Sequence, residues 1–122
     1  MQLVLSYPPS LNTYYRTYKG RMLISKDGRA YRALVAKELM VAKRVPPMRG
    51  ELEMTVHAYP PDKRRRDVDN LLKALLDALG KAGVYEDDSQ ITKLIVEMFK
   101  PVGDMDWPYE NVVVVFIEER SK

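Results

Sequence analysis

Residues 51–83 read ELEMTVHAYPPDKRRRDVDNLLKALLDALGKAG, and the change of pattern within them decides the fold. From residue 51 to residue 59 apolar and polar side chains alternate, which predicts a half-buried strand. From Asp69 the leucines recur every three or four positions, which predicts an amphipathic helix ending at Gly83. A proline-containing basic segment separates the predicted strand from the predicted helix.

Weaker patterns on both sides of this stretch predict the remaining elements. They predict a strand at 2–7, a loop from 8 to about 22, a helix from Ser25 or Asp27 to about Arg44, and strands at about 90–100 and 111–118. The last strand contains VVVVFI, whose apolar character on both faces indicates a central position. This order lacks a regular alternation of strands and helices. We therefore expect an α+β fold: one two-layer domain over residues 1–122, with a mixed sheet and two main helices.

Composition excludes several classes of protein. The chain has 122 residues, of which 46% are hydrophobic and 30% charged, as in a folded domain with a core and not a disordered or collagen-like chain. Because it has no cysteine, disulfides and thiolate metal sites are excluded, and a single histidine, His57, excludes a two-histidine metal site. There is no apolar run of about 18 residues, and the opening MQLVLSYPPS lacks the basic and apolar regions of a signal peptide, so we expect neither a membrane span nor a signal peptide. We expect a cytoplasmic protein without a membrane partner.

Charge is distributed unevenly along the chain. The net charge of +3 combines +8 in residues 1–50, zero in residues 51–83 and −5 in residues 84–122. Such a gradient suits a protein that holds a phosphate backbone with one region and a cation with another. An ordinary solvated surface would explain it equally well.

The predicted loop after the first strand mixes aromatic and basic residues. Within eight positions it contains Tyr14, Tyr15, Arg16, Tyr18, Lys19 and Arg21. Tyrosines stack on unpaired bases and cations contact phosphates, so this composition is typical of a surface that binds single-stranded or distorted nucleic acid. The alternative is a hairpin whose tyrosines cover the core.

The junction between the strand at 51–59 and the helix from Asp69 carries the strongest chemical signal. Four cations, Lys63, Arg64, Arg65 and Arg66, lead directly into two carboxylates, Asp67 and Asp69. In extended backbone these carboxylates point to the same side and can share one cation. Lys73 follows Asp69 by four residues, so the two side chains share one face of the helix. The structural alternative is a helix cap with salt bridges to the arginines.

A third acidic element, Glu86-Asp87-Asp88, follows the helix. If the next strand returns alongside the one that precedes Asp67, one of these carboxylates can complete an oxygen-only site for Mg²⁺. Phosphodiester hydrolysis uses such a site, with a nearby lysine to stabilise negative charge and a basic segment to hold phosphates. Otherwise these acids simply form a turn.

These segments resemble the RusA family of Holliday-junction resolvases of bacteria and their phages. The resemblance is carried by PPSLNTYYR at 8–16, SKDGRAYR at 25–32 and PDKRRRDVDNLLKALLDALGKAGVYEDDSQI at 61–91. It implies a homodimeric, Mg²⁺-dependent endonuclease, which recognises four-way DNA junctions and makes paired symmetric nicks in recombination and repair. It also implies that Asp67, Asp69 and Asp88 bind the metal, that Lys73 is essential, and that Asp87 supports them. The ligand types alone leave Mn²⁺ open as a substitute for Mg²⁺.

This resemblance also leads to a hypothesis for where DNA binds. We expect the loop from Asn12 to Arg21, with Asn12, Tyr14, Tyr15 and Arg16 in it, to contact DNA at the unstacked crossover, and Lys63 to Arg66 to contact it along phosphates. A two-fold junction cut on two opposed strands matches a dimer with two sites. Three other functions fit parts of the pattern: a non-catalytic module that binds branched DNA, a general nuclease of flaps and forks, and a structural RNA-binding protein.

Overall fold

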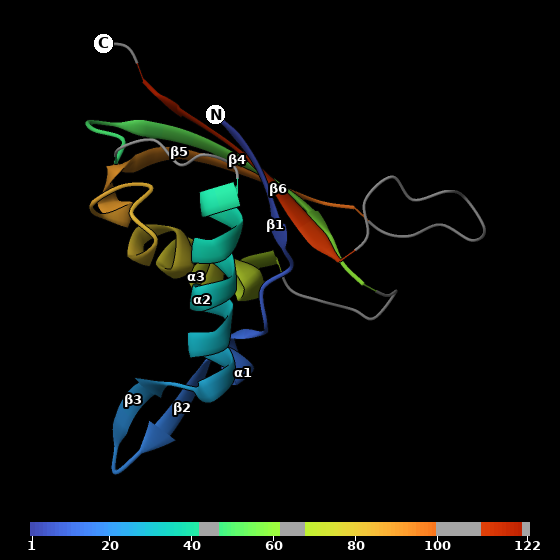
Figure 1. Ribbon diagram of the computed structural model, residues 1–122, viewed down its shortest axis with the longest axis vertical. Helices are drawn as coiled ribbons and strands as arrows, with labels where there is room; N and C mark the ends of the chain where they lie inside the picture. Colours follow the sequence, from blue (N-terminus) through green and yellow to red (C-terminus); the bar gives the residue numbers. More distant parts are fainter. Residues whose placement is uncertain (42–46, 62–67, 100–110, 121–122) are drawn as a thin grey trace, which may run out of the picture.

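The structure is a computed structural model that describes residues 1–41, 47–61, 68–99 and 111–120 (Figure 1). The elements are β1 (Gln2–Ser6), α1 (Leu11–Tyr14), β2 (Tyr15–Tyr18), β3 (Arg21–Ile24), α2 (Lys26–Val41), β4 (Leu52–Tyr59), α3 (Val68–Lys81), the 3-10 turn η1 (Asp88–Gln90), β5 (Ile91–Met98) and β6 (Val112–Glu119). This confirms the predicted α+β class, with a mixed sheet and two main helices. In the described part of the chain no helix is long and apolar enough to cross a membrane.

The main sheet has four strands in the order β1-β6-β4-β5. β6 pairs antiparallel with both β1 and β4, so the apolar VVVVFI strand is central, as its composition predicts. β4 and β5 run parallel, with Val56 opposite Val96 in the register. Parallel neighbours need a long crossover, and α3 supplies it. The fold therefore contains one βαβ unit, β4-α3-β5, that the sequence interpretation did not anticipate.

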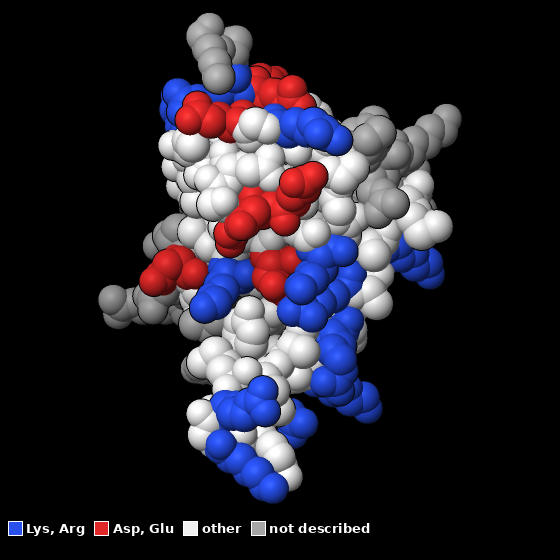
Figure 2. Space-filling view, turned by 90° about the vertical axis from the view of Figure 1, so that its left-hand side faces the viewer, with Lys and Arg blue, Asp and Glu red and all other residues white. Residues whose placement is uncertain are grey.

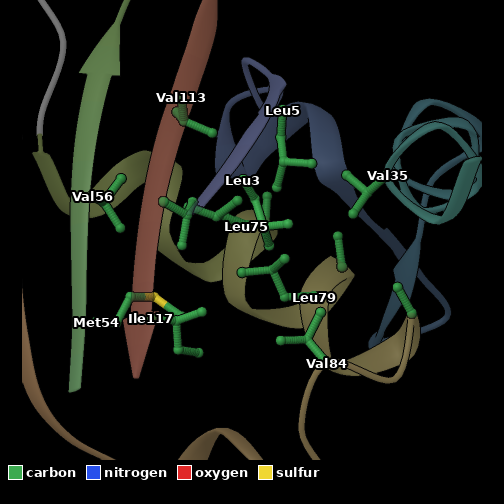
Figure 3. Close-up of a cluster of buried hydrophobic side chains, with 14 of the residues drawn as sticks. Leu3, Leu5, Val35, Met54, Val56, Leu75, Leu79, Val84, Val113 and Ile117 are labelled. Carbon is green, nitrogen blue, oxygen red and sulfur yellow. The ribbon is translucent and has the colours of Figure 1, made fainter. Parts of the chain in front are cut away.

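One face of the sheet packs on α2 and α3, which lie together beneath it (Figure 1). Alternate residues of β4, Leu52, Met54, Val56 and Ala58, are fully buried, as the period-two pattern predicts. Figure 3 shows side chains from β1, β4, β6 and both helices meeting in this core. From α3 the core receives Leu75 and Leu79, so the leucine stripe fixes which side of this helix faces solvent.

The sequence predicts either Ser25 or Asp27 as the residue that caps the start of helix α2. The Ser25 hydroxyl accepts a hydrogen bond from the Gly28 N–H at 2.9 Å, so Ser25 and not Asp27 is the N-cap. The helix buries Tyr31, Val35 and Leu39, whereas Leu34 is 41% exposed.

Residues 15–24, predicted as part of a loop, form a two-stranded hairpin that projects from the body of the molecule (Figure 1). Tyr18 pairs with Arg21 across a two-residue turn in which Lys19 and Gly20 both have positive φ. This is the pattern of a type I′ turn, which matches the twist of the flanking strands and favours glycine.

Candidate active site

Asp69 and Lys73 lie on the solvent-facing side of α3, in its first two turns. Both residues are exposed, and the i, i+4 spacing places them on one face of the helix, as predicted. A carboxylate in the first turn also interacts favourably with the positive end of the helix dipole. The other predicted residues of this motif, Lys63 to Asp67, lie outside the described residues.

The Lys73 ammonium lies over an aromatic ring. Its Nζ is 5.6 Å from the ring centroid of Tyr15, within the range of a cation–π interaction. Tyr15 begins β2, so this contact joins the base of the hairpin to α3. Burial raises the pKa of the Tyr15 phenol, with a smaller contribution from the nearby Asp77 carboxylate.

Asp77, one turn beyond Lys73, is held in a polar network that links three elements. The Arg32 guanidinium of α2 forms an ion pair with Asp77 Oδ2 at 2.8 Å, and the Tyr14 hydroxyl donates a hydrogen bond to the same oxygen. Arg32 Nε lies 2.8 Å from Asp77 Oδ2 and 3.1 Å from the Tyr14 hydroxyl oxygen. The network therefore ties α1, α2 and α3 together. Sequence reasoning did not find the role of Arg32, because its partners lie 18 and 45 residues away.

Of the aromatic residues predicted to contact DNA, Tyr14 has no exposed surface and Tyr15 is half-buried. Both tyrosines therefore follow the alternative interpretation, in which they pack against the core. The exposed aromatic and basic residues are farther along the hairpin: Arg16, Lys19, Arg21 and Tyr18, which is 52% exposed. Figure 2 shows blue side chains gathered at this projecting end of the molecule, with acidic groups nearer the body. Asn12 lies in α1.

The acidic loop after α3 has a defined conformation. Gly83 has φ +88°, and the N–H groups of Gly83 and Val84 donate to the carbonyls of Gly80 and Leu79, which is the Schellman pattern of a helix end. Asp87 then caps η1, since its carboxylate accepts from the Ser89 N–H at 3.0 Å. The Gln90 side chain closes this capping box.

The two neighbouring carboxylates of this loop differ in their environments. The Ser89 N–H bond, followed by interaction with Asp88, lowers the pKa of the Asp87 carboxyl. Burial, followed by the proximity of Asp87, raises the pKa of the Asp88 carboxyl. The Asp87 carboxylate thus stabilises the conformation of the loop. Burial and the nearby Asp87 carboxylate disfavour ionisation of the Asp88 carboxyl group. Asp87 therefore has a structural role in this loop, as the cap of η1.

The acidic loop lies at the C-terminal half of α3, away from Asp69. A pocket of about 230 Å³ is lined by Asp77, Lys81, Asp87 and Asp88, so Asp88 lies near Asp77. Asp69 and Asp77 are eight residues apart, or about 12 Å along a helix axis. The topology explains this separation. Asp69 follows the end of β4, whereas Asp88 precedes the start of the parallel strand β5, at the opposite end of these two strands.

The separation of the predicted carboxylate ligands determines whether one chain can hold the predicted metal ion. Among the described residues, no three acidic, histidine or cysteine side chains lie close enough together to hold a metal. Oxygen ligands of Mg²⁺ lie about 2.1 Å from the ion, so Asp69 and a carboxylate about 12 Å farther along the helix do not share one. Within the described part of a single chain, the predicted ligands therefore do not converge.

His57 takes no part in this arrangement. Its ring packs edge-on against Phe99 and Phe116, with centroids 5.3 and 5.2 Å away.

Comparison with known proteins defines the class of this fold and site. The family model described as Endodeoxyribonuclease RusA matches residues 6–117, and the chain belongs to this family. Among individual relatives, the crossover junction endodeoxyribonuclease RusA of Escherichia coli strain K12 is 43% identical over 89 residues, which cover 73% of this chain and 74% of that protein. The protein of the same name from Enterobacteria phage HK97 is 45% identical over 95 residues, covering 78% and 79%.

Proposed function

We propose that this protein is a crossover junction endodeoxyribonuclease that binds four-way DNA junctions and resolves them by paired, symmetric nicks. The observation that carries the proposal is the family match over residues 6–117, which includes the whole acidic and basic motif. The exposed Asp69 and Lys73 on one helix face support it, because hydrolysis of a phosphodiester needs a cation site and a positive side chain beside the scissile phosphate. The lack of cysteine fits a cytoplasmic enzyme.

The DNA-binding surface includes the projecting hairpin and the basic segment Lys63 to Arg66. At the hairpin tip, Arg16 and Lys19 both approach the Tyr18 ring, with charge-to-centroid distances of 5.8 and 5.5 Å. An exposed tyrosine flanked by cations suits an unstacked base with its adjoining phosphates, which a branch point offers and an intact duplex does not. We therefore assign stacking at the crossover to Tyr18 in place of Tyr14 and Tyr15.

The enzyme acts as a homodimer, and each active site takes residues from two copies. In this arrangement Asp67, Asp69 and Lys73 of one protomer lie beside Asp88 of its partner, whose position Asp87 stabilises. The β4-α3-β5 topology supports this arrangement, because it separates Asp69 from Asp88 within one chain. A two-fold dimer would bring the two groups of residues together at two equivalent sites, one for each strand to be cut. Mg²⁺ is the expected cation because the donors are carboxylate oxygens, and Mn²⁺ is the expected substitute.

Cleavage of a synthetic mobile four-way junction, compared with a linear duplex of matched sequence, tests the proposed function. We expect symmetric nicks on the junction alone, only when Mg²⁺ is present, and none from Asp88→Asn at the same concentration. The Asp88→Asn protein should still bind the junction, since it lacks a metal ligand and not a phosphate contact. Tight binding without cleavage under any divalent cation would instead identify a non-catalytic junction-binding module. Similar cleavage of flaps, forks and junctions would identify a general branched-DNA nuclease.

A further inference from the structure

The contact between Tyr15 and Lys73 joins the hairpin to the predicted catalytic helix. Lysine has a flexible side chain with four carbons, so an exposed lysine samples many rotamers unless a neighbour selects one. Here the ammonium of an otherwise exposed residue lies 5.6 Å from the centre of the Tyr15 ring. Attraction between the cation and the ring restricts Lys73 to orientations that keep Nζ over the aromatic face.

The Tyr15 ring is itself fixed in place. The ring of Tyr14 meets it edge-on, with centroids 4.8 Å apart and an interplanar angle of 79°. Tyr14 is completely buried, and its hydroxyl donates to Asp77 on the same helix as Lys73. Arg32 holds Asp77 from a third element. The ring that contacts Lys73 is thus positioned by a network anchored one turn further along α3.

We propose that Tyr15 is a positioning residue for Lys73, which holds the ammonium on the face of α3 that carries Asp69. The proposal rests on the proposed function, in which Lys73 stabilises charge at the scissile phosphate. It gives Tyr15 a role distinct from stacking on DNA. It also connects the hairpin to the proposed catalytic lysine of α3, because β2, the strand that bears Arg16 and Tyr18, begins at Tyr15, the residue that contacts Lys73.

The first test observes the contact in the free protein, without DNA or metal. Protons above a ring face are shielded, so the Lys73 ε-methylene signals should lie upfield in NMR spectra. Tyr15→Leu should return them to ordinary lysine positions, and Tyr15→Phe, which keeps the ring, should not. Tyr18→Leu is the matched control, because it removes another hairpin tyrosine without touching Lys73. Signals that stay unchanged in Tyr15→Leu would overturn the proposal.

The second test separates catalysis from binding. In single-turnover cleavage of a four-way junction, Tyr15→Leu should lower the rate about five- to thirtyfold, while Tyr15→Phe stays within about twofold of the unaltered protein. The junction Kd should change less than the rate in both variants. A loss of affinity without a loss of rate would overturn the proposal and make Tyr15 a DNA contact. Equal losses of rate in both variants would also overturn it. If the unaltered protein leaves junctions intact, the proposed function fails, and the NMR comparison alone decides whether Tyr15 holds Lys73.

Discussion

Replacing Gly28 by alanine should destabilise the protein, although alanine is the better helix former. Gly28 lies in the first turn of α2, where the substitution would gain up to about 1 kcal/mol from helix propensity. A Cβ at this position, however, would lie 2.3 Å from the backbone oxygen of Tyr14 and 2.7 Å from a side-chain carbon of Ile24. A backbone carbonyl cannot rotate away as a side chain can, so the base of the hairpin must move.

The magnitude follows from two costs. Overpacking of this kind costs about 1–3 kcal/mol. The displaced Tyr14 carbonyl also accepts hydrogen bonds from the Ser25 N–H at 2.9 Å and the Ser25 hydroxyl at 3.0 Å, each with a net contribution of about 0.5–1.5 kcal/mol. Together these costs come to about 2–6 kcal/mol, so after the gain in propensity of up to about 1 kcal/mol is subtracted we expect a net loss of about 1–5 kcal/mol.

Urea denaturation followed by circular dichroism measures this change as a shift of the midpoint at constant slope. Gly80→Ala provides the matched control, because its Cβ would meet only the Tyr85 ring, whose nearest carbon is 3.3 Å away. The control should stay within about 1 kcal/mol of the unaltered protein. A Gly28→Ala protein that is as stable as the control would refute the close packing between α2 and the hairpin base.

Two further predictions concern pH and salt. Burial raises the pKa values of Tyr14, Tyr31 and Tyr85 above their ordinary value of 10.0, so the folded state keeps these phenols protonated where the unfolded chain ionises them. The contribution of these tyrosines to stability should therefore be constant below about pH 10 and be lost progressively above it, and absorbance at alkaline pH should show these tyrosines ionising together with unfolding. Separately, replacing Arg64, Arg65 and Arg66 by alanine should flatten the dependence of log K on log salt for junction binding, by about 0.9 for each phosphate that the protein no longer neutralises. An unchanged slope would contradict the DNA role of this segment.

Local patterns in the sequence were sufficient for most of the sheet and both helices. Alternation predicted β4, the leucine stripe predicted α3, and VVVVFI predicted a central strand, because each of these signals reports burial of one face or both. The sequence indicated the hairpin only as an alternative to a loop, since its tyrosines and cations show no period. The one local signal for it was Lys19-Gly20, a glycine-containing pair that fits a tight turn between two short strands.

The composition of the candidate site was more accessible to sequence reasoning than its geometry. The sequence placed Asp69 and Lys73 on one helix face because that relation depends only on spacing. It did not place Asp88, because strand direction is decided by how the chain returns after α3. A strand, a helix of 14 residues and a second strand form a crossover that usually makes the strands parallel, and this signal could have predicted the separation. The Arg32–Asp77 pair depends on tertiary packing alone.

Complementation between two inactive variants tests most directly whether two copies share one active site. Asp69→Asn and Asp88→Asn should each be inactive alone. After equal amounts are refolded together, half of the dimers are mixed, and in the shared arrangement each mixed dimer has one site with both native carboxylates. About a quarter of all sites are then native.

If two copies share each active site, this mixture should nick four-way junctions, one strand at a time. A mixture of Asp69→Asn with Lys73→Ala is the control, because both substitutions affect the same half of the site and no dimer regains a native one. If each chain contained its own complete site, every site in the first mixture would carry a substitution. A mixture as inactive as the control, from proteins shown to have exchanged subunits, would contradict the account.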